Sequence, residues 1–291
     1  MKGLNKKTVK LLAIILSVAV ILALIAVLLS LNWHRIFLFA EENGIFCNPI
    51  EISDISELDT YMLSIDEIKN DGRISIDQSL MLINKEFLLP NDFAPEVSEY
   101  KTTTVYMNDC MISAYAEMSA DISKRFGKKL YVSSDFRSAE EQAQLYLDDP
   151  LTATISGASE HQSGLALDVY VAYFSGDGFI KSPIGRFVNR YCHRYGFIIR
   201  YPSFGEEITA IRFEPWHIRY VGQPHASIIY NNHLTLEEYI LSMEIGVWKM
   251  ADGYLISRQG IDENGRLELP KNFESCTISP DNTGYYIITV K

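Results

Sequence analysis

The chain has 291 residues, an ordinary share of hydrophobic (47%) and charged (22%) side chains, and a formal net charge of −11. This length allows one sizeable hydrophobic core together with a smaller additional unit. The negative charge argues against nucleic acid as a partner, because binding to phosphates needs a basic surface. We therefore expect the chain to have no nucleic acid partner.

The N-terminus is basic and is followed by a long apolar run. Four lysines crowd the first ten residues, namely Lys2, Lys6, Lys7 and Lys10. The run from Leu11 to Leu31 is uncharged, and as a helix it would span the roughly 30 Å hydrocarbon core of a membrane. Because the lysines precede the run, the N-terminus is expected in the cytoplasm. We predict a cytoplasmic tail over residues 1–10, a transmembrane anchor over 11–32 and an extracellular remainder.

A cleaved signal peptide is the main alternative for this apolar run. Signal peptides have a shorter apolar stretch, and small residues follow it at the cleavage site. The run here is long, and Ser30-Leu31-Asn32-Trp33 is a poor cleavage site. The sequence therefore favours an uncleaved anchor.

Residues 33–78 are acidic and weakly periodic, and we interpret them as a stalk between the anchor and the folded region. The chain has four cysteines, Cys47, Cys110, Cys192 and Cys276. An extracellular location permits disulfides, but the scattered spacing fits no zinc ribbon. Cys110 and Cys192 lie within helical patterns, so we interpret them as small buried hydrophobic residues.

The region that follows alternates between helical and strand patterns. Apolar side chains recur at three- and four-residue spacing over residues 106–126, and Gly127 follows, so an amphipathic helix is expected there. Short strands are predicted over 129–133 and 197–201. Three further helix starts are marked by capping signals, at Ser138 with Glu141, at Ser182 with Pro183, and at Thr235 with Glu238. Helices around a small, mostly antiparallel sheet are therefore expected, which is an α+β fold.

The last part of the chain, residues 244–291, has a different pattern. Short strand-like runs such as Tyr285–Val290 are separated by turn residues. We predict a small β appendage with no catalytic role of its own.

Two segments far apart in sequence contain the chain's most informative polar residues. His161 and Asp168 lie in the first, and Glu214 and His217 lie in the second. Catalytic zinc sites use three protein ligands of this kind and keep a fourth position for water. Asp168 lies on the polar face of an alternating strand, so it can point into a cleft while its apolar neighbours pack inside.

Glu214 could take a proton from a water molecule at such a site. On an ideal strand, Glu214 and His217 would point to opposite faces, but Pro215 allows a local bend that brings them together. Taken singly, each residue has an ordinary explanation, as a core histidine, a surface charge or a solvated aspartate. The other histidines are weaker ligand candidates, namely His34, His193, His225 and His233.

Arg137 directly precedes the predicted helix at Ser138. A guanidinium fork beside the positive end of a helix suits a ligand with a free carboxylate. An exposed arginine in an ordinary surface ion pair is an equally good explanation.

Taken together, these segments resemble the zinc D,D-carboxypeptidases of the VanY type, in a group that also holds D,D-dipeptidases. The family pattern S-x-H-x-x-G-x-A-x-D runs from Ser159 to Asp168, and E-P-W-H follows at residues 214–217. Further similar segments lie at residues 82–90, 131–138 and 195–202. The resemblance covers roughly residues 80–243, so a carboxypeptidase domain is expected over 79–243.

The resemblance implies a role for each matching residue. His161, Asp168 and His217 would bind Zn²⁺, and Glu214 would be the catalytic base. Arg137 and, less specifically, Ser159 would contact the substrate. The implied activity is removal of the last D-alanine from peptidoglycan stem peptides, or their lipid-linked precursors, that end in D-Ala-D-Ala, with a role in glycopeptide resistance. An L,D-carboxypeptidase on tetrapeptide stems and a non-catalytic zinc-bearing wall-binding module are the alternatives.

Overall fold

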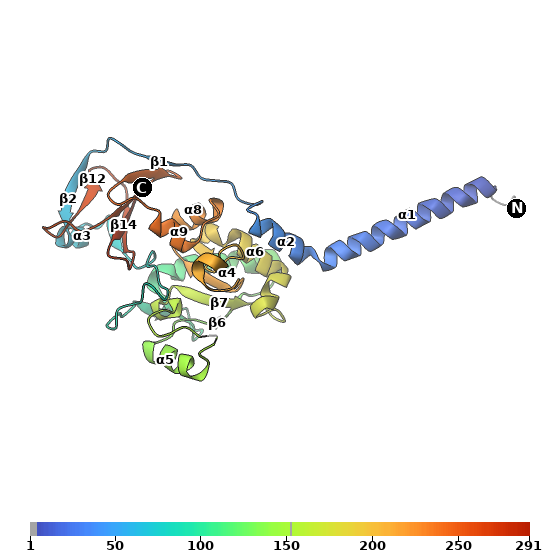
Figure 1. Cartoon of the computed structure of the whole chain (residues 1–291), viewed down its shortest axis with the longest axis horizontal. Helices are drawn as coiled ribbons and strands as arrows, with labels where there is room; N and C mark the ends of the chain where they lie inside the picture. Colours follow the sequence, from blue (N-terminus) through green and yellow to red (C-terminus); the bar gives the residue numbers. More distant parts are fainter. Residues whose placement is uncertain (1–4, 152) are drawn as a thin grey trace.

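The computed structural model describes residues 5–151 and 153–291 and has a mixed α+β architecture. A long N-terminal helix projects from a folded body, in which helices and a sheet lie beside a group of strands near the C-terminus (Figure 1). The predicted α+β fold class is confirmed. Residues 1–4, which include Lys2 of the predicted cytoplasmic tail, lie outside the described residues.

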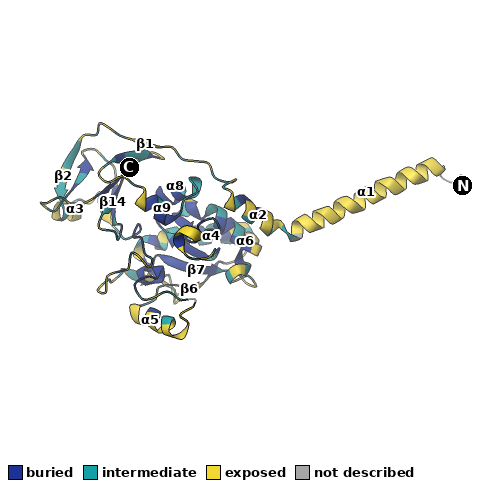
Figure 2. Ribbon diagram, in the orientation of Figure 1, coloured by how far each residue is buried: buried dark blue, intermediate teal, exposed yellow. Residues whose placement is uncertain are grey.

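The projecting helix, α1 (Lys6–Leu31), is exposed from Lys6 to Ser30 (Figure 2). It is long and apolar enough to cross a membrane, by length and composition. A single residue, Asn32, separates it from α2 (Trp33–Glu42). Phe37 and Ala40 of α2 are buried, so this second helix packs onto the folded body.

A four-stranded antiparallel sheet forms the centre of the larger unit. Its strands, in spatial order, are β6 (Tyr131–Ser134), β7 (Ala166–Tyr170), β9 (His217–Tyr220) and β8 (Phe197–Ile199). Leu167 and Val169 of β7 point into the main hydrophobic core, together with Met118 and Phe187. Side chains alternate along a strand, so Asp168 lies on the opposite face of β7.

Helices surround this sheet, and a short strand pair lies beside it. The α-helices are α4 (Ile112–Phe126), α5 (Ala139–Asp148), α6 (Pro183–Tyr191), α7 (Glu206–Thr209), α8 (His225–Asn231) and α9 (Leu236–Leu241). The 3-10 helices are η1 (Asp109–Met111), η2 (Glu160–Ser163), η3 (Gly176–Lys181) and η4 (Cys192–Tyr195). The strand pair is β4 (Val97–Glu99) with β5 (Tyr106–Asn108).

The capping signals start helices where the sequence predicts them. Ser138 and Thr235 each form a capping box with the glutamate three residues later, and Ser182 accepts a hydrogen bond from the backbone N–H of Gly185. The helix expected from residue 106 begins only at Ile112. The preceding residues pair with β4 instead, and the Asn108 side chain accepts the backbone N–H of Cys110 to start η1.

The strands near the C-terminus form a second unit. Its larger sheet contains, in spatial order, β1 (Ile52–Asp54), β10 (Trp248–Ala251), β11 (Tyr254–Gln259), β14 (Tyr286–Val290), β13 (Cys276–Pro280) and β3 (Ile74–Ile76). A two-stranded sheet pairs β12 (Arg266–Pro270) with β2 (Thr60–Ser64). We call these strands, together with α3 (Ile65–Asn70), the β unit.

The β unit changes the interpretation of residues 33–78, which were expected to form a stalk. This segment contributes α2, α3 and three strands, and each strand pairs with a partner from beyond residue 244. Ile68 is buried with Leu267 and Leu269 in one hydrophobic cluster. The segment is therefore folded, and the predicted C-terminal appendage is completed by strands from the N-terminal side.

The two units meet along the segment that leads into the larger unit. The backbone N–H of Leu80 donates to Ser279 Oγ (3.0 Å), and the backbone N–H of Leu82 donates to the Asp281 carbonyl (3.0 Å). Both leucines are buried. The β unit thus fixes the backbone of residues 80–82 from one side.

All four cysteines are free thiols in the described part of the chain. Cys192 is buried in the main hydrophobic core, as interpreted from sequence, and Cys276 is buried as well. Cys47 and Cys110 are only partly buried.

Candidate metal centre

His161 lies in η2 and is held in place by the backbone around it. Its Nδ1 lies 2.9 Å from the carbonyl oxygen of Asp135, so this nitrogen carries the proton and donates it. Nε2 then faces the Asp168 carboxylate, with 3.6 Å to Oδ2. Gly164 ends η2 with a φ of +69°, and a Cβ there would lie 2.6 Å from a methyl group of Val97. The sharp turn after His161 therefore requires glycine.

Asp168 and His217 are direct cross-strand neighbours in the pairing of β7 with β9. This pairing brings Asp168 Oδ1 to 3.1 Å from His217 Nδ1. The two histidine rings pack edge to face, with 5.1 Å between their centroids. The two segments singled out from sequence therefore meet in space, and the sheet register brings them together.

Glu214 reaches the same place through a turn rather than a strand. The His217 backbone N–H donates to the Glu214 carbonyl (3.1 Å), which closes the turn around Pro215 and Trp216. As a result, Glu214 Oε2 lies 3.8 Å from His217 Nδ1. The bend that the sequence allowed is present. Burial raises the pKa of the Glu214 carboxyl, His217 opposes the shift, and Asp168 adds to it.

The geometry of His161, Asp168 and His217, which we call the metal-binding group, fits a metal ion. One ligand atom from each of His161, Asp168 and His217 can be chosen so that all three lie within 4.8 Å of one another. Asp168 Oδ1 is buried but has no hydrogen-bond partner within the described residues, although His217 Nδ1 is close by. Two imidazoles and one carboxylate are a donor set that zinc prefers. The three side chains converge without satisfying one another, which is what a bound cation would require.

The charges around His217 are arranged unusually. Burial lowers the pKa of His217, but the Asp168 and Glu160 carboxylates more than offset this and raise it to about 9. Burial raises the pKa of Asp168, but the nearby imidazoles of His161 and His217 hold it well below its usual value. The group therefore attracts positive charge, as a proton or as a metal cation.

Arg137 and Ser159 lie in the backbone that surrounds this group. The Arg137 backbone N–H donates to the His161 carbonyl (3.1 Å). Its guanidinium donates to Ser134 Oγ (2.8 Å) and to Gln142 Oε1 (2.7 Å), which fixes its direction. Ser159 is buried, precedes η2 and makes no side-chain cap with the described residues of that helix.

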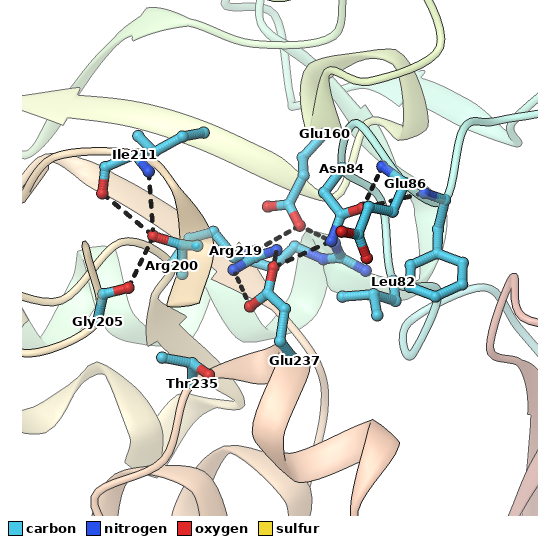
Figure 3. A network of polar contacts seen from close by, with 12 residues as sticks. Leu82, Asn84, Glu86, Glu160, Arg200, Gly205, Ile211, Arg219, Thr235 and Glu237 are labelled. Atoms are coloured by element: carbon cyan, nitrogen blue, oxygen red, sulfur yellow. Dashed lines mark hydrogen bonds and ion pairs between the residues drawn. The ribbon is translucent and has the colours of Figure 1, made fainter. Parts of the chain in front are cut away.

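The sequence did not single out the charged groups that lie behind the histidines. Glu160, Arg200, Arg219 and Glu237 are all buried and form a connected network of ion pairs (Figure 3). Glu160 also approaches His217, with 3.6 Å between Oε2 and Nε2. The sequence signal that could have revealed this network is an arginine within an apolar, strand-like run. Such an arginine is expected to be buried, and a buried guanidinium needs a buried carboxylate as its partner.

The other histidines of the described chain lie elsewhere, and one of them, His34, is in α2 next to the long apolar helix. His193 stacks on Tyr230, and His233 packs against Phe204. His225 lies between the hydroxyl groups of Tyr239 and Thr289. Each of these three has a structural partner, and none of them belongs to the metal-binding group.

Comparisons with known proteins identify the family. The VanY family, described as D-alanyl-D-alanine carboxypeptidase, matches residues 104–223. A D-alanyl-D-alanine carboxypeptidase of Enterococcus faecium is 33% identical over 65% of this chain and 62% of the relative. The putative carboxypeptidase YodJ of Bacillus subtilis (strain 168) is 33% identical over 64% of this chain and 72% of the relative.

The chain belongs to the VanY family of D-alanyl-D-alanine carboxypeptidases. It spans less than two thirds of the Enterococcus faecium relative. The family is one of peptidases, and the metal-binding group lies inside the matched residues.

Two solved structures resemble the fold of this family member. One is the vancomycin resistance D,D-dipeptidase VanXYg in complex with a D-Ala-D-Ala phosphinate analog, at a TM-score of 0.62 and 25% identity, covering 81% of this chain and 99% of that one. The other is the LD-carboxypeptidase LdcB, at a TM-score of 0.53 and 30% identity, covering 67% of this chain and 95% of that one.

Proposed function

We propose that the chain is a membrane-anchored zinc D,D-carboxypeptidase that removes the last D-alanine from peptidoglycan stem peptides ending in D-Ala-D-Ala. One observation carries the proposal. His161, Asp168 and His217 converge within 4.8 Å beside the Glu214 carboxylate, in a chain of the VanY family.

The three converging residues would hold Zn²⁺ beside the central sheet. His161 would bind through Nε2, because its Nδ1 is committed to the Asp135 carbonyl. His217 would bind through Nδ1, the nitrogen that faces Asp168. A zinc ion held there would lower the pKa of a water molecule to about 7 and polarise the scissile carbonyl.

Glu214 would carry the proton transfers of peptide-bond hydrolysis. The carboxylate would take a proton from the attacking water, whose oxygen forms the new bond to the carbonyl carbon. It would then pass that proton to the leaving amine nitrogen as the C–N bond breaks. Burial, which raises the pKa of Glu214, suits a group that must both accept and release a proton.

Arg137 and Ser159 would bind the substrate near the scissile bond. The Arg137 guanidinium is already oriented by Ser134 and Gln142, so little rotational freedom would be lost when it binds a carboxylate. A grip on the terminal carboxylate would restrict cleavage to the last residue of the peptide.

An extracellular position of the catalytic unit would support a cell-wall substrate. We infer that α1 spans the membrane, with Lys6, Lys7 and Lys10 at its N-terminal end on the cytoplasmic side and the catalytic unit outside the cell. Peptidoglycan stem peptides and their lipid-linked precursors are within reach of an enzyme held there. Removal of the terminal D-alanine would destroy the D-Ala-D-Ala target of glycopeptide antibiotics and would contribute to resistance.

The resemblance to the LD-carboxypeptidase LdcB supports a second candidate, cleavage of tetrapeptide stems. The metal-binding group does not distinguish the two substrates. A zinc-bearing wall-binding module without turnover is less well supported, because such a module would have no use for Glu214.

Mass analysis of products from pentapeptide and tetrapeptide stems, with and without a chelator, tests these proposals. We expect D-alanine release from the pentapeptide that stops when metal is removed. Release from the tetrapeptide alone would establish the second candidate instead. Glu214→Gln should lower kcat by about 10²–10⁴-fold while zinc stays bound, whereas Glu206→Gln, at an exposed carboxylate of α7, should not. Undiminished activity in Glu214→Gln would refute the assigned mechanism.

A further inference from the structure

The His217 imidazole lies between two carboxylates, and only one of them belongs to the metal-binding group. Nδ1 faces Asp168 Oδ1 at 3.1 Å, while Nε2 faces Glu160 Oε2 at 3.6 Å. The His217 and Glu160 side chains are 6% and 0% exposed, so no bulk solvent separates them. The Nε2 side of the His217 ring therefore faces the Glu160 carboxylate, to which the proposed function assigns no role.

Glu160 is held so that one oxygen is fixed and the other is left for His217. Its Oε1 accepts a hydrogen bond from Arg200 Nε (2.7 Å) and another from Arg219 Nη1 (2.5 Å). Its Oε2 has no hydrogen-bond partner within the described residues, and the same is true of His217 Nε2. Buried polar atoms are paired in nearly all proteins, so these two atoms are each other's natural partners.

The two arginines are in turn held by partners outside the metal-binding group. Arg200 makes a bidentate pair with Glu237 at 2.8 and 2.6 Å. Arg219 donates to the carbonyl oxygens of Ser79 (3.0 Å) and Met81 (2.7 Å), in the segment that the β unit fixes. The Glu160 carboxylate therefore forms ion pairs with two buried guanidinium groups, each of which is fixed by further partners.

We propose that Glu160 is a positioning residue, whose Oε2 accepts the Nε2 proton of His217 and thereby leaves Nδ1 as the nitrogen that binds the metal. This inference rests on the proposed function, because it assumes that His217 binds zinc. The present 3.6 Å separation is longer than a hydrogen bond, so the ring must shift slightly towards Glu160 when the metal binds.

The two histidines would then be supported differently. The Nδ1 proton of His161 goes to a neutral backbone carbonyl, whereas the Nε2 proton of His217 goes to a charged carboxylate. A carboxylate behind a ligating imidazole fixes its tautomer and makes it a stronger ligand. η2 would thus supply both a metal ligand, His161, and the residue that orients a second ligand on β9.

Zinc affinity in the full-length protein, measured by competition with a chromophoric chelator, tests this proposal. Glu160→Gln keeps the size of the side chain but removes its charge, and we expect a 10- to 100-fold weaker affinity, as is typical for such support residues. Glu237→Gln is the matched control, because Glu237 is a buried carboxylate on the same arginine but not on His217. Its zinc affinity should stay within about threefold of wild type.

The spectrum of the Co²⁺-substituted protein provides a readout of the ligand geometry itself. We expect the visible bands to change in Glu160→Gln and to remain as in wild type in Glu237→Gln. Equal losses of affinity in both variants, or no loss in Glu160→Gln, would overturn the proposal. Failure of the wild type to bind zinc would instead refute the proposed function.

Wild-type protein allows a test that does not depend on either variant folding. Two-bond ¹H–¹⁵N correlation spectra of the zinc-loaded chain report which nitrogen of each histidine carries the proton. We expect His217 to be protonated at Nε2 and His161 at Nδ1. A proton on His217 Nδ1 would overturn the assignment.

Discussion

The metal-binding group and the turn around Asp281 in the β unit both bury carboxylates. The two sites differ in whether hydrogen bonds from the protein pair these carboxylates. Asp281 is fully buried and accepts hydrogen bonds from Arg258 Nε (2.7 Å), from the hydroxyl group and the backbone N–H of Thr283, and from the backbone N–H of Tyr285. Asp168 lies close to two histidines, yet its Oδ1 has no hydrogen-bond partner in the described chain. The protein alone supplies all the partners of Asp281, whereas Asp168 keeps an oxygen that a bound cation could use.

Two histidines show the same contrast. His225 is buried between the hydroxyl groups of Tyr239 (2.7 Å) and Thr289 (2.8 Å), and burial lowers its pKa to about 3. His217 is equally buried but faces carboxylates, which raise its pKa to about 9. Burial is therefore not what distinguishes a functional histidine in this fold. What differs is that carboxylates face the His217 ring, whereas only neutral hydroxyl groups face His225.

Replacing Asp168 should have the largest effect on the candidate metal centre. We expect Asp168→Asn to weaken zinc binding by more than about 100-fold, beyond the loss typical of residues that only support a ligand, with a similar loss of kcat/KM. The core face of β7, with Leu167 and Val169, is untouched, so circular dichroism should show a folded protein. Asp177→Asn, at an exposed aspartate, is the control. Wild-type zinc affinity in Asp168→Asn would remove Asp168 from the ligand set.

Asp281→Asn should show the reverse pattern. The substitution leaves Arg258 buried with a weakened partner, and breaking a buried ion pair costs about 3–5 kcal/mol of unfolding free energy. Urea denaturation of the metal-free protein measures this loss, and Glu263→Gln, an exposed site in the same unit, should be neutral. Folded Asp281→Asn should bind zinc as the wild type does. A stability unchanged from wild type would mean that the complete pairing of Asp281 contributes nothing.

The resemblance to the VanY family predicted which residues converge, and within each segment their geometry is mostly local. His161 and Asp168 are separated by one short turn at Gly164, and Glu214 and His217 by one turn at Pro215. Joining the two segments needed only the pairing of β7 with β9, which the shared motifs imply.

The supporting network and the strands that residues 52–76 add to the β unit were not predicted, because both depend on contacts between distant segments. Glu160 adjoins His161, but its arginines come from β9 and from the residue after β8, within runs that look like ordinary apolar strands. The strands of residues 52–76 are short, and their partners lie near the opposite end of the chain. The pattern of such short segments does not reveal non-local pairing.

His225 should produce a smaller, pH-dependent effect at the junction of the two units. Its folded-state pKa of about 3 lies below the ordinary value of 6.5, so the folded chain keeps it neutral while the unfolded chain takes up a proton. The stability that it contributes is present above about pH 6.5 and is lost as the pH falls towards 3. Between pH 7 and pH 5 the loss should be about 2 kcal/mol.

His225→Gln removes this titration and should show a correspondingly flatter dependence of unfolding free energy on pH in metal-free protein. Thr289→Val is the matched control, since it removes one hydrogen-bond partner of His225 but keeps the imidazole. That variant should lose stability at both pH values and keep most of the slope. If His225→Gln and wild type show the same slope, His225 does not remain neutral in the folded chain. The contrast with His217 would then not come from the surrounding charge.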